Sequence, residues 1–392
     1  MSTTAPPAAR TGRLLVHQFD PVSPVPGGID GCIRDILKYL PSGTDVAVVG
    51  VDGGQGPAER RLGRWERHVL GETPFWFLPV ARLDPAAPGR RMPHILRVLA
   101  GTARYWRRIP DAVRVDAHRM DTALVIGTLK RRPVTYFIHT QAAGLRSGHS
   151  DSFWRFAGAL HGKLEERVVR GSADVIVFNA DYAKQATRWN RAARFMPQWF
   201  DPQLLAPAGG ARDAHRLVWV GRLEAPKDPA LAIAAYAELV ERFPDAGYTL
   251  EMLGSGTLLP AVQALVAGLP EGVRSGITLR GRVERGEVAE ISCSSGVFLM
   301  TSHPGYEGYP RSLVEALAAG LPAVVTHGSD TGGLVVDGIT GYTCGREPSE
   351  LALRIADATG LDRNGPVSAV AHLRAETLVQ SVFNAPVQNG AR

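Results

Sequence analysis

"HPGYEGYPRSLVEALAAGLPAVVT", residues 303–326, predicts a short amphipathic helix, a Gly-Leu-Pro stop and the β-branched strand "AVVT". Glu307 lies at the start of this helix, and Pro310 is expected at its first position, where a missing N–H costs little. The unpaired amides of such a helix start favour a phosphate group. Glu315 follows about 7–8 Å further along the axis, which is the span from a nucleotide diphosphate to its ribose. One carboxylate could therefore serve a sugar and the other a ribose.

Short β-rich runs alternate with helical patterns along the whole chain, which indicates parallel sheets built from βαβ units. Before residue 196 we expect strands at 13–19, 45–51, 122–127, 134–140 and 174–178, and helices near 29–40, 92–108, 152–170 and 181–190. After residue 214 we expect strands at 216–221, 248–253, 277–281, 296–300 and 323–326, and helices near 229–243, 258–268, 285–293, 310–319 and 348–359. The pattern predicts an α/β protein of two doubly wound, Rossmann-like domains that face each other across a cleft.

The composition is that of a globular protein, with 45% apolar and 21% charged residues among 392. No apolar run approaches the roughly 18–20 residues of a membrane-spanning helix, and the first dozen residues lack the apolar core of a secretory signal. Three cysteines, Cys32, Cys293 and Cys344, match no metal or redox spacing and favour reduced cytosolic thiols. The net charge of +6 is uneven: 29 Lys/Arg and 17 Asp/Glu precede residue 195, whereas 15 and 21 follow. The two halves should therefore meet different partners.

Two stretches of the second half end predicted strands with residues that suit a phosphorylated ligand. In "VGRLEAPKDP" (220–229), Arg222 and Lys227 flank a turn, where they could bind a diphosphate or simply be surface cations. In "LGSGTLLP" (253–260), Gly254 and Gly256 would let a ligand approach the backbone, or would form an ordinary turn.

Two stretches of the first half are candidates of the same kind. In "PGGIDG" (26–31), Gly27 and Gly28 form either a clamp over the ligand or a mobile surface loop. His139 ends the predicted strand "YFIHT" and could point toward a ligand, although a lone histidine is more often structural.

The order of these motifs resembles the family 4 retaining glycosyltransferases of the GT-B fold (glycosyl transferases group 1), most closely from Val220 to Gly341. The resemblance implies a flexible tail at 1–12, an acceptor-binding domain at 13–200, a linker at 201–214 and a nucleotide-sugar-binding domain at 215–392, whose last helix can pack back on the first domain. Glu307 would contact the transferred sugar and Glu315 the ribose. The positions that it assigns to donor binding are Gly27, Gly28, Gly221, Arg222, Lys227, Gly254, Arg282, Val283, Glu307, Gly308, Tyr309, Pro310, Arg311, Ser312 and Glu315, and those assigned to catalysis are Glu307, His139, Arg222 and Lys227.

The activity that the resemblance implies is retaining hexosyl transfer from a nucleotide-diphosphate-sugar, UDP preferred and GDP next, to a glycan, lipid-linked or small-molecule acceptor in polysaccharide or glycoconjugate biosynthesis. No metal or other cofactor is expected, and no Asp-x-Asp triplet occurs in the chain. Family members commonly have Lys-Gly where this chain has Lys227-Asp228. A nucleotide-binding scaffold without turnover and a sugar-nucleotide epimerase of the same fold are the alternatives, which donor-hydrolysis and transfer assays would separate.

The basic first half raises the question of a second partner. In "RRMPHILRVLAGTARYWRRI" (90–109), apolar residues recur at helical spacing while Arg90, Arg97, Arg104 and Arg108 fall largely elsewhere. The pattern predicts either a core-packed helix with a solvated basic face or a surface for an anionic membrane or lipid-phosphate acceptor. We expect a cytoplasmic protein with peripheral contact at the inner membrane face as a hypothesis, and no nucleic-acid binding, because the second half is acidic.

Overall fold

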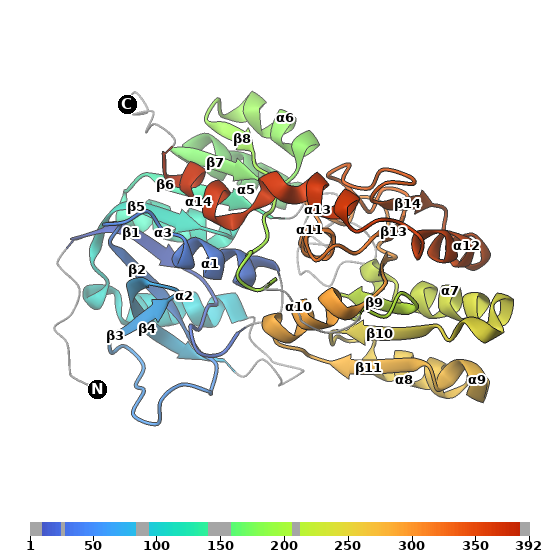
Figure 1. Cartoon of the computed structure of the whole chain (residues 1–392). Helices are drawn as coiled ribbons and strands as arrows, with labels where there is room; N and C mark the ends of the chain where they lie inside the picture. Colours follow the sequence, from blue (N-terminus) through green and yellow to red (C-terminus); the bar gives the residue numbers. More distant parts are fainter. Residues whose placement is uncertain (1–9, 25–27, 84–93, 140–157, 206–211, 385–392) are drawn as a thin grey trace. The chain divides into compact units, whose positions relative to one another are not determined.

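The computed structural model describes residues 10–24, 28–83, 94–139, 158–205 and 212–384 (Figure 1). These residues form two compact units, one from 10–139, 159–196 and 379–384, the other from 197–378. Each unit contains one mainly parallel sheet with helices between its strands. The expected division into two Rossmann-like α/β domains is therefore confirmed.

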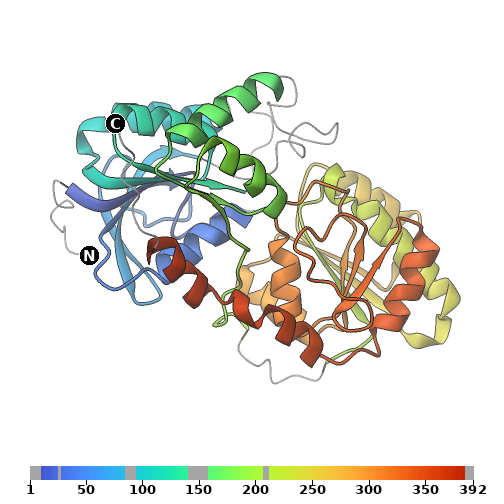
Figure 2. The same ribbon diagram turned by 90° about the horizontal axis from the view of Figure 1, so that it is seen from above.

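The first unit has an eight-stranded sheet in the order β3-β4-β2-β1-β5-β6-β7-β8, parallel except for the β3–β4 hairpin. Helices lie on both of its faces (Figure 2). Its strands are β1 (Arg10–Val16), β2 (Val46–Asp52), β3 (Glu66–Leu70), β4 (Thr73–Arg82), β5 (Asp111–Ala117), β6 (Val134–Ile138), β7 (Asp174–Val177) and β8 (Ala193–Phe195). Its helices are α1 (Gly28–Lys38), α2 (His94–Arg104), the 3-10 turn η1 (Trp106–Arg108), α3 (Met120–Lys130), α5 (Gly158–Gly171) and α6 (Ala180–Trp189).

The second unit has a six-stranded parallel sheet in the order β11-β10-β9-β12-β13-β14. Its strands are β9 (Arg216–Val220), β10 (Thr249–Leu253), β11 (Ile277–Gly281), β12 (Val297–Met300), β13 (Ala323–Thr326) and β14 (Gly341–Cys344). Its helical segments are η3 (Ala225–Lys227), α7 (Pro229–Arg242), η4 (Pro244–Ala246), α8 (Leu259–Ala267), α9 (Glu271–Arg274), α10 (Arg285–Ser294), α11 (Arg311–Ala318), α12 (Pro348–Ala358), α13 (Asn364–Val370), η5 (Ala371–Leu373) and α14 (Ala375–Asn384).

One face of the second sheet is buried under α7, α8 and α12. Trp219 and Leu250 of the sheet belong to the same core cluster as Tyr236, Val262 and Ile355 of the three helices. Burying a side chain of this size contributes about 1.5–3 kcal/mol relative to leaving it exposed. The apolar side chains of these three helices therefore hold them against this face of the sheet.

The last helix, α14, begins in the second unit and continues into the first. Gln380 Nε2 donates a hydrogen bond to the Tyr39 carbonyl oxygen at 3.2 Å, and the Arg13 guanidinium lies 4.2 Å from the centre of the Phe383 ring. Residues 379–384 thus pack with the N-terminal domain, although the chain reaches them after completing the second sheet.

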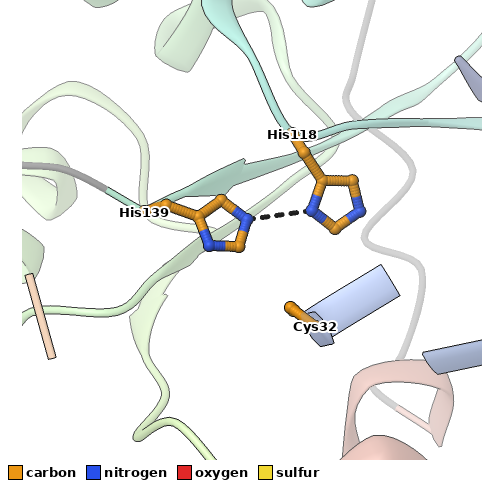
Figure 3. A group of neighbouring side chains, drawn as sticks. All are labelled: Cys32, His118 and His139. Atoms are coloured by element: carbon orange, nitrogen blue, oxygen red, sulfur yellow. Dashed lines mark hydrogen bonds between the residues drawn. The ribbon is translucent and has the colours of Figure 1, made fainter. Parts of the chain in front are cut away.

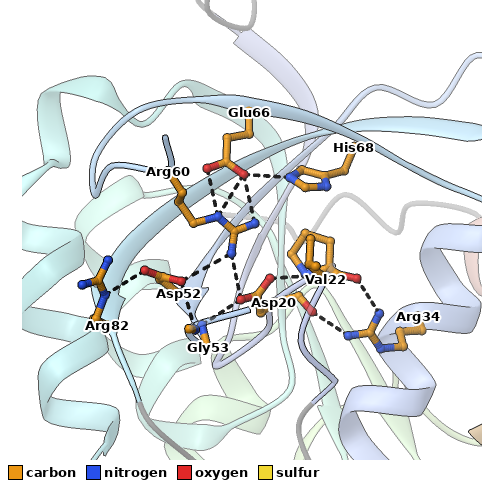
Figure 4. Close-up of polar contacts among 11 residues, drawn as sticks. Asp20, Val22, Arg34, Asp52, Gly53, Arg60, Glu66, His68 and Arg82 are labelled. Atoms are coloured by element: carbon orange, nitrogen blue, oxygen red, sulfur yellow. Dashed lines mark hydrogen bonds and ion pairs between the residues drawn. The ribbon is translucent and has the colours of Figure 1, made fainter. Parts of the chain in front are cut away.

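A buried ion-pair network holds the connection between β1 and α1 (Figure 4). The Arg60 Nη1 atom lies 2.8 Å from Asp20 and 3.6 Å from Asp52, while its Nε atom donates to Glu66 at 3.0 Å. Arg34 of α1 donates to the Pro21 carbonyl oxygen at 3.0 Å. Since Arg60, Asp20 and Asp52 are all buried, each charge is balanced inside the protein. The network fixes the chain just before the glycine stretch predicted as a clamp.

The strand expected at 122–127 is wrong, because these residues lie in α3. A six-residue apolar run does not distinguish a strand from a buried helix. The strand of this region is β5, which was missed because Arg114 and Asp116 interrupt its apolar pattern. Inside the sheet, Asp116 accepts two hydrogen bonds from Arg13 of the neighbouring β1, both at 2.9 Å. A buried ion pair thus replaces the apolar contact that the sequence pattern required.

The remaining differences concern ends and short elements. The predicted helix at 92–108 ends as an α-helix at Arg104, and β1 begins at Arg10, inside the expected tail 1–12. Residues 152–157 and 206–211, within the expected helix and linker, lie outside the described residues. The sequence patterns did not predict β3, β4, β8, β14, α9 and α13, and for α14 the resemblance implied only a last helix without bounds. The predicted strands and helices between 216 and 359 are confirmed, with ends that differ by only a residue or so.

Candidate active site

The two central strands of the second sheet mark its topological switch point. From β9 the sheet grows through β10 to β11 on one side, and from β12 through β13 to β14 on the other. In open α/β sheets, ligands bind beside the carboxyl ends of the strands at such a point. The two segments that leave β9 and β12 here are residues 221–228 and 301–310.

A lysine–glutamate pair joins these two segments. Lys227 Nζ lies 2.5 Å from Glu307 Oε1, and the Ser302 hydroxyl donates to the same oxygen at 2.7 Å. The Lys227 and Glu307 side chains are only 13% and 11% exposed. Two of the residues predicted for the site, 80 positions apart in the chain, are therefore in direct contact. Each charge is held in place by the other and remains at the edge of the sheet.

A second contact lies beside this pair. Arg222 Nη2 donates to the Tyr306 hydroxyl at 2.6 Å, and Lys227 Nζ lies 6.0 Å from the centre of the Tyr306 ring. Arg222 is exposed, so its guanidinium is available to an anion from solvent. Arg222 and Lys227 were predicted from the sequence, whereas Tyr306 and Ser302 were missed because their only signal was their position near Glu307.

Asp228 forms a left-handed turn at the position where the resemblance leads us to expect glycine. Its φ of 44° lies in the region that favours glycine, and its Oδ1 atom accepts a hydrogen bond from the Leu231 amide at 3.1 Å, which caps α7. Arg346 also pairs with the Asp228 carboxylate. The backbone of Asp228 therefore has a conformation that favours glycine, and the Asp228 side chain caps α7. The Thr301 hydroxyl lies within hydrogen-bond distance of the carbonyl oxygens of Lys227, 2.9 Å, and Asp228, 2.8 Å.

The glycines of the turn after β10 approach their own chain closely. A Cβ atom at Gly254 would lie 1.8 Å from the Gly221 carbonyl oxygen, and one at Gly256 would lie 2.3 Å from that of Leu223. Gly254 also has a φ of 145°. Packing against residues 221–223 thus explains both glycines, and contact of Gly254 or Gly221 with a ligand stays a prediction.

The helix start in residues 307–312 differs by one position from the expectation. Pro310 is the N-cap, with a ψ of 95°, and α11 begins at Arg311. Arg311 Nε donates to Glu315 Oε1 at 2.9 Å, and Arg285 Nη2 lies 3.6 Å from the same oxygen. The Glu315 side chain is 30% exposed and keeps contact with solvent. The ion pair between Arg285 and Glu315 thus connects the start of α10 with α11.

The other predicted donor residues lie around this start. The Gly308 carbonyl oxygen accepts a hydrogen bond from the Thr331 hydroxyl at 2.8 Å, and burial raises the pKa of Tyr309 to about 12. Ser312 and Val283 are half-buried, and Arg282 is exposed. The donor-binding role of Arg282 and Val283 stays a prediction.

The first sheet has its own switch point, between β1 and β5. His17 and His118 follow these strands directly, and His139 follows β6. His118 Nδ1 lies 2.9 Å from His139 Nε2 (Figure 3), and the His118 ring stacks on Phe137 with centroids 4.3 Å apart. Burial lowers the pKa of His118 well below its ordinary value and that of His17 to about 3, so both rings are neutral.

His139 was predicted from the sequence, whereas His17 and His118 were missed. The available signal was that "DAVRVDAH" places a histidine directly after an alternating strand. Gly28 begins α1 in this unit, whereas Gly27 lies outside the described residues.

Residues 214–359 match the family of Glycosyl transferases group 1. This part of the chain is therefore similar to the group 1 glycosyltransferases. The match contains both segments at the β9–β12 switch point, and with them Arg222, Lys227, Glu307 and Glu315.

Known proteins similar to this chain agree with the family. The glycogen synthase of Mycobacterium tuberculosis is 28% identical over 269 residues, which cover 62% of this chain and 58% of that protein. The match thus spans little more than half of the length of that relative.

Solved structures show the fold. The sucrose-phosphate synthase of Thermosynechococcus elongatus matches with a TM-score of 0.73 and 17% identity, over 95% of this chain and 97% of that one. Anabaena HepE, in complex with UDP-glucose, matches with a TM-score of 0.67 and 16% identity, over 95% and 98%. Two Rossmann-like α/β domains in this order are the GT-B fold. Among the described residues, no helix has the length and apolarity needed to span a membrane.

Proposed function

We propose that this protein is a retaining, metal-independent glycosyltransferase that moves a sugar from a nucleotide-diphosphate-sugar to a hydroxyl group of an acceptor. The observation that carries the proposal is the contact between Lys227 and Glu307 at the switch point of the domain similar to the group 1 glycosyltransferases. A cation suited to a diphosphate and a carboxylate suited to sugar hydroxyls are joined there, as a donor with both groups requires.

The donor is held by charge and by backbone amides. Arg222 and Lys227 neutralise the diphosphate, and Glu315 holds the ribose hydroxyls. The preferred donor nucleotide is UDP, then GDP; Anabaena HepE, whose fold is similar, was solved with UDP-glucose. The first domain supplies the acceptor side, and His139 is assigned to catalysis.

The reaction proceeds on one face of the sugar. As the bond to the diphosphate breaks, the leaving oxygen takes the proton of the attacking hydroxyl, and an oxocarbenium-like centre forms between them. Arg222 and Lys227 stabilise the growing negative charge on the leaving group. Glu307 is assigned to sugar hydroxyls and Glu315 to ribose, so neither acts as the nucleophile of a double displacement.

A thermal-shift screen of UDP-, GDP- and ADP-sugars tests donor binding. A ligand at 100 times its Kd adds about 2.7 kcal/mol to the free energy of unfolding, and Lys227→Ala should abolish the shift. Proton NMR of the product formed with a hydroxyl acceptor then tests retention at the anomeric carbon. Donor binding without transfer to any acceptor would indicate a nucleotide-binding scaffold, whereas an altered sugar without transfer would indicate an epimerase.

We also propose salt-sensitive binding of the first domain to anionic lipid, which brings a lipid-linked acceptor to the protein by charge. Arg104, the last residue of α2, and Arg107 of η1 are exposed. Arg97 and Arg108 donate hydrogen bonds to the carbonyl oxygens of Arg82 and Gly63, both at 2.6 Å. They are therefore partly engaged in holding their own domain.

Co-sedimentation with anionic and neutral vesicles at low and high salt tests this proposal, since surface charge attraction is screened by salt. The double variant Arg104→Ala/Arg107→Ala should sediment less than wild type. Arg188→Ala/Arg191→Ala, a pair of equal charge at exposed positions on and after α6, is the matched control. Wild type that ignores anionic vesicles at low salt would indicate a soluble small-molecule acceptor.

A further inference from the structure

Three potential metal ligands meet at the carboxyl edge of the first sheet (Figure 3). Cys32 comes from α1, His118 follows β5 and His139 follows β6. One ligand atom of each residue lies within 4.8 Å of the other two. Cys32 lies more than 80 residues before His118, so no spacing motif in the sequence indicates this group.

The group has the chemistry of a zinc site. A Cys thiolate and two neutral imidazoles are ligands that Zn²⁺ prefers, and a three-residue set leaves one position open for water. With Zn–S near 2.3 Å and Zn–N near 2.0–2.1 Å, tetrahedral ligand atoms lie roughly 3.3–3.7 Å apart. The two ring nitrogens, now 2.9 Å apart, would separate slightly, and the most distant atoms would approach by about 1 Å.

We propose that Cys32, His118 and His139 bind Zn²⁺, and that the bound ion inhibits the protein by occupying His139. The inhibition rests on the proposed function, but the binding does not. Cys32 is fully buried and His118 is 3% exposed, whereas His139 is only partly buried and gives the ion a route from solvent.

A metal ligand must be a neutral imidazole or a deprotonated thiol. In the metal-free state one ring donates its N–H to the other. On binding, that ring must carry its proton on the other nitrogen, and the Cys32 thiol must release its proton to solvent. The His118 Nε2 atom, buried and without a hydrogen-bond partner among the described residues, can carry a proton without breaking any existing contact.

Cobalt titration of the full chain, freed of metal by chelation, tests the binding. Co²⁺ should produce tetrahedral d–d absorption and a thiolate-to-cobalt charge-transfer band, and Zn²⁺ should remove both at one equivalent. Cys32→Ser should abolish the charge-transfer band and weaken Zn²⁺ binding more than tenfold, since even partners outside the ligand set are worth about 10–100-fold in affinity.

The matched control is Cys293→Ser, which removes a thiol of the other unit and should leave the cobalt spectrum unchanged. Circular dichroism of each variant verifies that it is folded. His118→Asn should lose the d–d bands as well. Failure of wild type to give the charge-transfer band, or a band that persists in Cys32→Ser, would overturn the site.

The inhibition is measured separately, as the rate of sugar transfer against free Zn²⁺. Wild type should lose activity and recover it with a chelator, while Cys32→Ala, compared with its own metal-free rate, should require more than tenfold higher Zn²⁺. Zinc binding without loss of sugar transfer would refute the proposed inhibition but not the proposed zinc site. Absence of transfer at every Zn²⁺ concentration, with normal cobalt spectra, would contradict the proposed function alone.

Discussion

Replacing Glu307 with glutamine removes one charge from the candidate site with little change in shape. The glutamine amide oxygen can still accept from Lys227 Nζ and from the Ser302 hydroxyl, which now lie 2.5 Å and 2.7 Å from Glu307 Oε1. What the variant loses is the negative charge that faces the sugar hydroxyls. Because both side chains of the pair are nearly nine-tenths buried, solvent screens this charge only weakly.

The expected loss can be estimated from the strength of the hydrogen bond involved. A hydrogen bond to a charged group is worth about 1.5–3 kcal/mol, and each 1.36 kcal/mol is a factor of ten in rate. If this bond strengthens in the transition state, Glu307→Gln should lower kcat by roughly 10- to 150-fold. Affinity for UDP should stay equal or rise, because Lys227 loses its internal counter-charge and attracts the diphosphate more strongly.

Steady-state kinetics with isothermal titration of UDP separate the two effects. Glu251→Gln is the matched control: Glu251 is equally buried in β10 and pairs with Arg216 and Arg280, but lies within a strand. It should lower the melting temperature without lowering kcat. Wild-type turnover in Glu307→Gln, or a fall in UDP affinity as large as the fall in kcat, would refute the role of Glu307 in the transition state.

Glu315→Ala should weaken UDP binding by roughly 10- to 150-fold, the worth of a charged hydrogen bond; unchanged affinity in calorimetry would contradict the ribose role. Sugar transfer should survive EDTA, and a complete loss that a divalent ion restores would contradict the metal-independent mechanism. The first unit should lose stability in acid. Burial alone would raise the pKa of Asp52 and that of Glu66. Asp52 accepts hydrogen bonds from Gly54 and Arg82, and Glu66 accepts hydrogen bonds from His68 and Arg60. These hydrogen bonds outweigh burial, so both pKa values are lowered. Their stabilisation is therefore present above the ordinary values, 3.8 and 4.5, and is lost as the pH falls through the folded-state values. Urea unfolding from pH 6 to pH 3 should show this fall for wild type and a smaller one for Asp52→Asn/Glu66→Gln; equal slopes would refute the assignment.

The sequence alone determined the architecture of the second half. Strands such as "RLVWV" and helices such as "ALAIAAYAELVER" have unambiguous periods, and Gly or Pro separates them. It also predicted Glu307, Glu315, Arg222 and Lys227 as site residues, because they belong to one series of motifs that resembles a known family. In the first half local patterns were weaker: β5 carries a buried Asp116 that a neighbouring strand neutralises, and no local period reports such a partner.

Only the tertiary structure decided which of these residues touch. Lys227 and Glu307 pair because parallel strands far apart in sequence become neighbours at the β9–β12 switch point, which brings their carboxyl-end segments together. In the first sheet the neighbouring strands β5 and β6 likewise bring His118 and His139 to one edge, where α1 supplies Cys32. Sequence spacing could not reveal either group, since strand order, rather than distance along the chain, sets which strand ends are adjacent.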